Sequence, residues 1–461
     1  MKTLIFFGGT GNLFVNKIFP ALVTMYARGD LENVQVVAIG RRFSSQDDYQ
    51  NFLLKTLTEK DPALLSEDSI REFWKCLHYL QGDIEDDSTF VKLNQHLAAC
   101  CTEAIFYLST LPNLYQNALR QIKSFFPETL LKNAKVALEK PFGDNLPSFQ
   151  KLKQTLQQTF LERNIFYVDH YLGKEIVLNL IILKAENWFL ERLLSREFVK
   201  EVHIGLCERE GVAERKVFYE QTGAIKDVLQ NHLLQLLALI AVDAPPLCET
   251  DPRECASFLE ALAYEKSKLL SKIHLPPPEH IKLGQYTSYR EETGYLNSTT
   301  ETLFVVPLFV ATPRWRGVPF YLISGKKMAE KRSFIKVIFS SHLDYTNALY
   351  MEIQPEERID LYLRLKRPGT TLSAMDTRLN FSYAGNFKGA SSQAYQKIIL
   401  DILSGDRALF PDSSFIENAW RLTDQLKTLL DEHQHPFFFY PDYTLTAESL
   451  LTERRSENAI P

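Results

Sequence analysis

The chain has 461 residues, too many for one ordinary hydrophobic core and about enough for two substantial domains. Its apolar content of 45% and charged content of 24% are typical of a globular protein in water. The formal charge is −5, from 52 basic and 57 acidic residues, so there is no basic surplus to neutralise a nucleic acid or an anionic membrane.

Cysteine usage and the first residues favour a cytoplasmic protein. The cysteines are scattered and form no CxxC pair, which predicts reduced thiols. The start, MKTLIFFGG, has no apolar segment followed by a cleavage site. The apolar run at 233–242 is interrupted by Gln235 and is too short to cross a bilayer.

Strand and helix patterns alternate over residues 1–170. A stretch with helical spacing follows the first strand, at 13–29. Short apolar runs predict strands at 3–7, 34–40, 104–110 and 135–140. Since the intervals can hold crossover helices, we expect an α/β Rossmann domain with a doubly wound parallel sheet over residues 1–170.

The pattern changes after about residue 176. A long helix is expected at 223–241. Alternating runs then predict strands at 300–311, 318–324, 333–341, 349–355 and 359–366. They indicate a larger α+β domain with a mostly antiparallel sheet over residues 171–461, and 452–461 is expected to be a frayed tail.

The segment FFGGTGNL, residues 6–13, lies between the first predicted strand and helix. Gly8 and Gly11 would allow a tight turn that brings backbone N–H groups to a pyrophosphate at the helix N-terminus. The pattern is not GxGxxG, because Phe14 stands where the third small residue would lie. An ordinary strand–helix loop is the competing interpretation.

Two arginines, Arg41 and Arg42, follow the second predicted strand directly. An enzyme that uses NAD usually has Asp or Glu there, to bind the ribose 2′-hydroxyl. A guanidinium can instead bind a 2′-phosphate with two hydrogen bonds. This placement favours NADP over NAD, with a solvated basic pair as the alternative.

The predicted helix at 223–241 carries His232 inside an apolar stripe, if 100° per residue is assumed. Beside the stripe runs a polar ridge of Asp227, Asn231 and Gln235, each four residues apart. A histidine in such a place could be a general base. From this helix alone, a core histidine satisfied by one hydrogen bond is the better interpretation.

Three further signals are basic. If VDHYLGKE, residues 168–175, is helical, His170 and Lys174 lie one turn apart. Two basic side chains at that spacing slightly destabilise a helix unless an anion lies across them. Lys140 and Lys326 each end a predicted strand, in LEKPFG and ISGK. Each of these lysines alone could equally belong to a simple turn.

Taken together, these segments resemble the glucose-6-phosphate dehydrogenase family. The start FFGGTGNLFVNKIFPAL resembles that family's GxxGDLxxxKxxPAL. Further family motifs follow in the family's order, over roughly residues 4 to 425: LEKPFG, VDHYLGKE, TGAIKDVLQNHLLQ, GQYT, STTETLF, RWRGVPFYLISGKKM, IQPEE and LSGDRALF. The resemblance implies the two domains described above.

Matched motifs imply roles for individual residues. His232 would be the general base that takes the proton from the C1 hydroxyl, and Asp169 the carboxylate that pairs with it. The 6-phosphate would be bound by His170, Tyr171 and Lys174. The other sugar-binding positions would be Lys140, Glu208, Asp227, Lys326 and Gln354. The cofactor positions would be Gly8, Gly11, Asn12, Lys17, Arg41, Arg42, Lys140 and Pro141.

The resemblance therefore implies oxidation of glucose 6-phosphate to 6-phosphoglucono-δ-lactone, with hydride transfer to NADP, the first step of the oxidative pentose phosphate pathway. It also implies a homodimer or homotetramer and a cis Lys140–Pro141 peptide. We expect no metal, because no cluster of metal-ligating residue types stands out.

The chain departs from the family pattern at Asn12, where the family has Asp, and at Phe14. It also has FFFYPDYTLTAESLL in place of the C-terminal YxxGSxGP-like signature. Two alternatives remain open: a dehydrogenase of another sugar phosphate, and a non-catalytic homologue that binds NADP or a sugar phosphate.

Overall fold

The computed structural model describes residues 1–60, 67–98, 101–243, 252–342, 345–387, 394–407 and 409–452; most of the expected tail at 452–461 lies outside them. The chain divides into two compact units. Unit 1 is Met1–Gly173 with Ser392–Ser413, and unit 2 is Lys174–Ser391 with Ser414–Pro461. The predicted domain boundary at residue 170 stays a prediction; it did not include the return of Ser392–Ser413 to unit 1.

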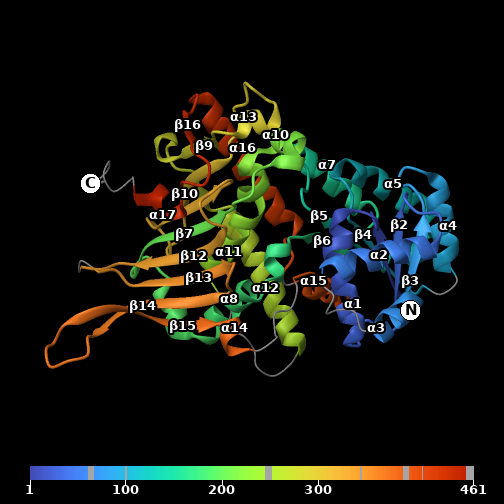
Figure 1. The fold of residues 1–461 in the computed structure, drawn as a ribbon, viewed down its shortest axis with the longest axis horizontal. Coiled ribbons are helices and arrows are strands. Elements are labelled where there is room, and N and C mark those ends of the chain that lie inside the picture. The colour runs from blue at the N-terminus through green and yellow to red at the C-terminus, as the bar shows by residue number, and fades with distance from the viewer. Residues whose placement is uncertain are drawn as a thin grey trace. The chain divides into compact units, whose positions relative to one another are not determined.

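Unit 1 is built on a parallel sheet with strand order β3-β2-β1-β4-β5-β6 (Figure 1). This is the dinucleotide-binding order, and it confirms the predicted Rossmann sheet. The strands are β1 Lys2–Phe7, β2 Val34–Gly40, β3 Leu77–Gln81, β4 Glu103–Leu108, β5 Lys135–Glu139 and β6 Ile165–Val168. The central strands are almost wholly buried, as their continuous apolar runs require of a sheet covered on both faces.

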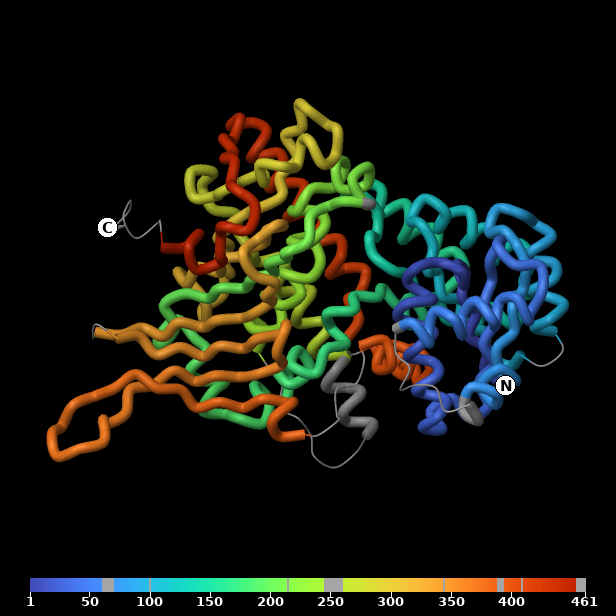
Figure 2. Tube along the Cα trace, viewed as in Figure 1, coloured from blue at the N-terminus to red at the C-terminus, as the bar shows by residue number. Residues whose placement is uncertain are grey.

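Helices connect these strands. They are η1 Phe14–Ile18, α1 Phe19–Ala27, α2 Gln46–Lys60, α3 Glu67–Cys76, α4 Asp87–Ala98, η3 Pro112–Leu114, α5 Tyr115–Phe125, α6 Glu128–Leu131, α7 Leu146–Gln157, η4 Glu162–Asn164 and η5 His170–Gly173. One helix of unit 1, α15 Ala394–Ser404, comes from far along the chain, and Figure 2 shows its orange trace beside the blue helices.

Helix α15 is held at both ends. The ammonium groups of Lys2 and Lys135 donate hydrogen bonds to the carbonyl of Leu403 near its C-terminus, at 2.8 and 3.0 Å. Cations suit the negative end of a helix dipole. Near its N-terminus, a Cβ added to Gly173 would lie 2.7 Å from the carbonyl oxygen of Ala394. Only glycine therefore allows η5 and α15 to approach so closely.

Unit 2 is built on a second sheet, with order β15-β14-β13-β12-β7-β11-β10-β9-β16 and with β8 beside β10. Most of its neighbours are antiparallel, which confirms the predicted architecture, but β7–β11 and β9–β16 pair in parallel. The strands are β7 Val199–Cys207, β8 Ile273–His274, β9 Lys282–Tyr286, β10 Leu303–Val310, β11 Pro319–Gly325, β12 Arg332–Phe339, β13 Ala348–Gln354, β14 Arg358–Lys366, β15 Ala374–Ser382 and β16 Phe437–Tyr440.

The helices of unit 2 include the one that carries His232. They are α8 Glu175–Glu186, α9 Trp188–Leu193, η6 Ala213–Arg215, α10 Lys216–Ala224, η7 Ile225–Leu233, α11 Leu234–Ala241, α12 Pro252–Leu270, η8 Pro278–His280, α13 Tyr289–Thr293, α14 Tyr383–Asn386, α16 Ser413–Glu432 and α17 Ala447–Thr452. Over the part of the chain that the structure describes, none of the helices combines the length and apolarity needed to cross a membrane.

A buried carboxyl group, Glu139, ends strand β5. The hydroxyls of Tyr107 and Tyr395 donate hydrogen bonds to its Oε1, at 2.6 and 3.2 Å. Tyr115 donates to its backbone carbonyl at 2.7 Å. Burial raises the pKa of Glu139 to about 7, although the two tyrosine hydrogen bonds act in the opposite direction. This cluster joins β4, β5, α5 and α15 directly before Lys140.

We expect Gly173→Ala to destabilise unit 1 by about 1–3 kcal/mol, because the added methyl group overlaps the Ala394 carbonyl and η5 must move away from α15. Thermal unfolding measures the effect. The control is Gly385→Ala, where the nearest atoms lie 3.7 Å from the added Cβ. Equal midpoints for the two variants would contradict the close approach.

We expect Glu139→Gln to remove a pH dependence of stability. Because the folded pKa is raised to about 7, the folded state holds the proton more tightly than the unfolded state does. Ionisation therefore costs the wild type stability as pH rises from about 4.5 to about 7, by up to roughly 3 kcal/mol. Denaturant unfolding from pH 5 to 8 tests this, with exposed Glu32→Gln as control. Parallel profiles for wild type and Glu139→Gln would refute it.

Candidate active site

The glycine turn after β1 is packed against the residues that directly follow strand β4. Gly8 has φ of +93°, and a Cβ there would lie 2.5 Å from the Ser109 carbonyl oxygen. The N–H groups of Gly8 and Gly9 donate to the Ile39 carbonyl at 3.1 and 2.8 Å, and that of Gly11 donates to the Gly8 carbonyl at 2.8 Å. The turn thus lies where the strand order reverses, between β1 and β4, the usual place for a dinucleotide.

The helix after this turn does not begin as an α-helix. The sequence predicted one helix over 13–29, whereas Phe14–Ile18 is a π-helix and α1 starts at Phe19. Phe14 is fully buried, with its ring 5.1 Å from that of Phe6. A π-helix has a wider turn than an α-helix, so it gives this large side chain room above the sheet. Asn12 and Lys17 are exposed beside the turn.

Arg41 and Arg42 come directly after β2, as predicted. The side chain of Arg41 is 77% exposed and forms an ion pair with Asp83 at 3.3 Å. The Arg42 guanidinium lies over the rings of Phe43 and Phe52, at 5.2 and 4.8 Å from their centroids. An exposed ion pair contributes little free energy, so an incoming anion can displace Asp83 from Arg41 at a small cost in free energy.

Strands β5 and β6 end beside each other and carry the next candidates. The Lys140–Pro141 peptide after β5 is cis, which confirms that expectation. Asp169 follows β6; it is buried, and its Oδ1 accepts a hydrogen bond from the Tyr171 N–H at 3.0 Å. The ring of His170 stacks on that of Tyr395 from α15, with centroids 6.5 Å apart and planes at 12°.

The segment 168–175 is not one helix, so the one-turn spacing of His170 and Lys174 is wrong. His170–Gly173 is a short 3₁₀ turn, and the Leu172 N–H donates to the Asp169 carbonyl at 3.1 Å. Lys174 has extended backbone angles, φ −83° and ψ 138°, and precedes α8. The close approach of α15 to Gly173 explains why a tight turn, rather than a helix, stands here.

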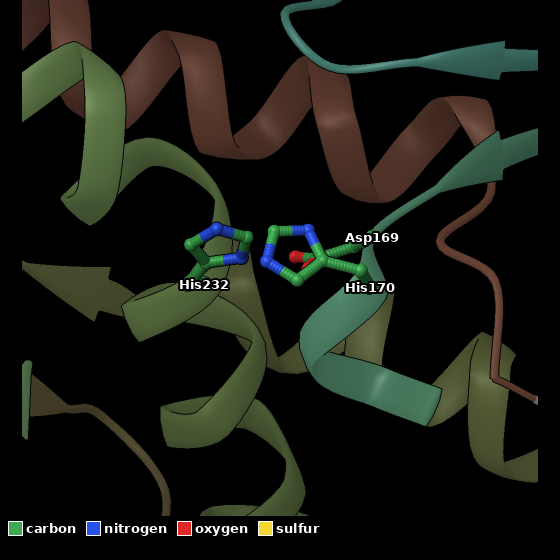
Figure 3. Close-up of side chains that lie close together, drawn as sticks. All are labelled: Asp169, His170 and His232. Atoms are coloured by element: carbon green, nitrogen blue, oxygen red, sulfur yellow. The ribbon is translucent and has the colours of Figure 1, made fainter. Parts of the chain in front are cut away.

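His232 lies on a π-helix, so the wheel of 100° per residue was wrong over Ile225–Leu233. The ridge of Asp227, Asn231 and Gln235, expected at the edge of the buried face, is itself buried. The Asn231 side chain accepts from the His232 N–H at 2.6 Å and donates to the Asp227 carbonyl at 3.1 Å. Figure 3 shows His232 on this helix, and Asp169 and His170 on the turn after β6.

Gly223, two residues before the π-helix, stands where a side chain would not fit. Gly223 has φ of +66°, and a Cβ there would lie 2.4 Å from Oε1 of Glu301. The same Oε1 accepts from the Ile225 N–H at 3.2 Å, which suits a carboxylate at a helix N-terminus. Arg215 pairs with Asp227 at 3.6 Å. Two charged residues, Glu301 and Arg215, therefore contact the first turn of the π-helix.

Glu208 and Lys326 meet because β7 and β11 pair in parallel. Cys207 and Gly325, the last residues of the two strands, are partners in the register, so the next two side chains emerge together. The Lys326 ammonium donates to Glu208 and lies 5.2 Å from the ring centroid of Tyr219. Gln354 ends β13 and is partly buried.

Candidate residues thus gather in both units, in one set in unit 1 and in two sets in unit 2. In unit 1, the ends of β1, β2, β5 and β6 carry the glycine turn, Arg41, Lys140 and Asp169. In unit 2, the sets are Glu208 with Lys326 and Asp227 with His232. Glu139 is a residue that the sequence reasoning missed; the signal was a carboxyl group at the end of a continuous apolar strand.

Comparison with protein families gives one consistent result. Residues 5–179 match the model of the glucose-6-phosphate dehydrogenase NAD binding domain, and residues 181–455 match that of the glucose-6-phosphate dehydrogenase C-terminal domain. The chain is 32% identical to the glucose-6-phosphate 1-dehydrogenase of Borreliella burgdorferi, covering 95% of this chain and 94% of that one. It is 32% identical to glucose-6-phosphate 1-dehydrogenase 2 of Mycobacterium tuberculosis, covering 91% and 87%.

Solved structures agree. A glucose-6-phosphate dehydrogenase in complex with its substrate glucose-6-phosphate superposes with a TM-score of 0.89 at 27% identity, over 100% of this chain and 98% of that one. The glucose-6-phosphate 1-dehydrogenase of Mycobacterium avium gives 0.84 at 26% identity, with the same coverage. Both family models, the relatives matched along most of their length and the two solved structures agree. The chain therefore belongs to the glucose-6-phosphate dehydrogenase family.

Proposed function

We propose that this protein oxidises glucose 6-phosphate at C1 to 6-phosphoglucono-δ-lactone, with NADP as the hydride acceptor. The observation that carries the proposal is the buried His232, held on a π-helix by Asn231, in a chain of this family. The related structure with glucose-6-phosphate bound supports the choice of substrate.

His232 acts as the general base in this proposal. Its imidazole takes the proton of the C1 hydroxyl while the hydride leaves C1, and the carboxylate of Asp169 stabilises the imidazolium that forms. Burial of both groups favours this role, because a low dielectric strengthens the attraction between a carboxylate and an imidazolium.

The sugar phosphate is held at its two ends. The 6-phosphate is bound by His170, Tyr171 and Lys174. Their charge-assisted hydrogen bonds strongly favour a phosphorylated sugar over an unphosphorylated one. The sugar hydroxyls are bound by Lys140, Glu208, Asp227, Lys326 and Gln354. The pair of Lys326 and Glu208 offers a donor beside an acceptor, as a hydroxyl group requires.

The family and its nucleotide-binding domain indicate a nicotinamide cofactor, which supplies the hydride acceptor when it is bound. The turn fits it, because Gly8 has positive φ and brings backbone close at the switch point of the sheet. Gly11, Asn12, Lys17, Lys140 and Pro141 complete the proposed cofactor positions, and Arg41 with Arg42 select NADP.

We further propose a cytoplasmic homodimer or homotetramer. The family resemblance supports the assembly. The location is supported by the scattered cysteines, which form no CxxC pair.

The proposed reaction is tested by NADP reduction with glucose 6-phosphate, beside a panel of other sugar phosphates. Replacing the base in His232→Asn should lower kcat by at least ~10²-fold and leave substrate binding in place. Gln230→Ala, a change at another buried polar residue of the same helix, is the control. Near-normal turnover in His232→Asn would refute this mechanism.

The proposed cofactor preference has its own test. Arg41→Ala should raise KM for NADP by roughly tenfold or more, since it loses charge-assisted hydrogen bonds to the 2′-phosphate, and should leave NAD kinetics nearly unchanged. Arg120→Ala, an exposed arginine on α5, is the control. If Arg41→Ala weakens NADP and NAD equally, Arg41 has a structural role only.

A further inference from the structure

The residue after Lys326 has a backbone conformation that is unusual for a lysine. Lys327 has φ of +48°, in the left-handed region that favours glycine. Its N–H donates to the Glu210 carbonyl at 3.3 Å, and its own carbonyl accepts from the Tyr443 N–H at 2.7 Å. Such a conformation persists only where surrounding contacts hold it. Strained residues of this kind are found most often at functional sites.

The side chain of Lys327 is held by two carboxylates. Its ammonium lies 2.9 Å from Oε2 of Glu292 and 3.1 Å from Oδ2 of Asp442. It also donates to the Ser288 hydroxyl at 3.1 Å, and the ring centroid of Tyr286 is 5.1 Å away. Burial by itself lowers the pKa of Lys327, but hydrogen bonds to both carboxylates raise it overall. The group therefore stays charged.

The same C-terminal segment also holds Lys326. The hydroxyl of Tyr440, a buried residue at the end of β16, donates to the Lys326 carbonyl at 2.7 Å. The Lys326 N–H donates to the Thr302 carbonyl at 3.0 Å, and the Tyr440 hydroxyl also pairs with the Thr302 hydroxyl at 2.9 Å. Three residues after Lys326, the Ala329 N–H donates to the Leu445 carbonyl at 2.9 Å. Residues 440–445 thus run along 326–329.

We propose that Tyr440, Asp442 and Lys327 are positioning residues for the substrate, which fix the backbone from which Lys326 reaches the sugar. This inference rests on the proposed function, because it takes Lys326 as a sugar-binding group. We call residues 440–445 the C-terminal clamp. They belong to the part of the chain that has lost the family's usual C-terminal signature.

The physical reason is the length of the lysine stem. Four rotatable bonds separate the Lys326 ammonium from its backbone, so its reach depends on where that backbone is fixed. A misplacement of about 1 Å at a binding group can cost a factor of about 10² in catalysis, even when its cause lies away from the reacting atoms. The clamp fixes the backbone on both sides, through the Lys326 carbonyl and through the Lys327 side chain.

The experiment compares Asp442→Asn, Lys327→Gly and Tyr440→Phe with the wild type. We expect each to raise KM for glucose 6-phosphate by roughly threefold to tenfold and to leave KM for NADP within about twofold, since only the sugar side loses alignment. Lys327→Gly is informative because glycine adopts positive φ without strain but provides no ammonium. A double variant, Lys327→Gly with Asp442→Asn, should match Lys327→Gly alone, because Lys327→Gly already removes the ion pair between Lys327 and Asp442.

Lys331→Gln is the matched control. It lies on the same segment and pairs with Glu210 at 2.8 Å, but the two side chains are 53% and 60% exposed. We expect no change in either KM, because exposed pairs contribute little.

Two outcomes would overturn the inference. If Asp442→Asn and Lys327→Gly keep wild-type KM values while Lys326→Met raises KM, Lys326 binds the sugar but needs no clamp. If KM rises equally for both substrates, with a lower unfolding midpoint, the segment supports the fold only. If the other variants fold poorly, Tyr440→Phe still distinguishes these two outcomes, because it removes only one hydroxyl group. An inactive wild type would instead refute the proposed function.

Discussion

The constraint on which the proposed site depends is that parallel strands end at a common edge. In unit 1 the glycine turn follows β1, Arg41 follows β2, Lys140 follows β5 and Asp169 follows β6, and all four are parallel strands of one sheet. Unit 2 uses the same constraint once, in a sheet that is otherwise mostly antiparallel. There the parallel pair β7 and β11 delivers Glu208 and Lys326 side by side. The ends of parallel strands are therefore enough to bring candidate functional side chains together.

Much of this framework could be predicted from the sequence. The apolar runs at 34–40 and 135–140 correspond to β2 and β5 almost residue for residue, since a strand buried on both faces is a continuous apolar segment. Strand β7 was missed, because the charged residues Lys200 and Glu201 near its start interrupt the apolar run. Without β7, the strand pattern could not show that Glu208 and Lys326 would meet, and only the family resemblance assigned both to one sugar.

The helices at the candidate site were the less predictable part. A period of 100° per residue describes neither Phe14–Ile18 nor Ile225–Leu233, because both are π-helices whose wider turns depend on packing. The return of α15 to unit 1 was equally invisible, since the contact between Gly173 and Ala394 joins residues far apart in the chain. Motif resemblance named the candidate site residues, but it could not give the backbone on which they lie.

Three buried or partly buried ionisable groups show how the fold holds side chains that would be unfavourable without a partner. Glu139 is satisfied by tyrosine hydroxyls, Glu301 by a helix N-terminus, and Lys327 by two carboxylates. In each case the partner is supplied from another part of the chain, so the polar contact also fixes the position of a site element. A hydrophobic contact could support the same elements, but it would set their orientation less sharply because it has no preferred direction. That difference explains why a strained lysine, held by charged partners, can stand beside Lys326 where a glycine would suffice for the backbone.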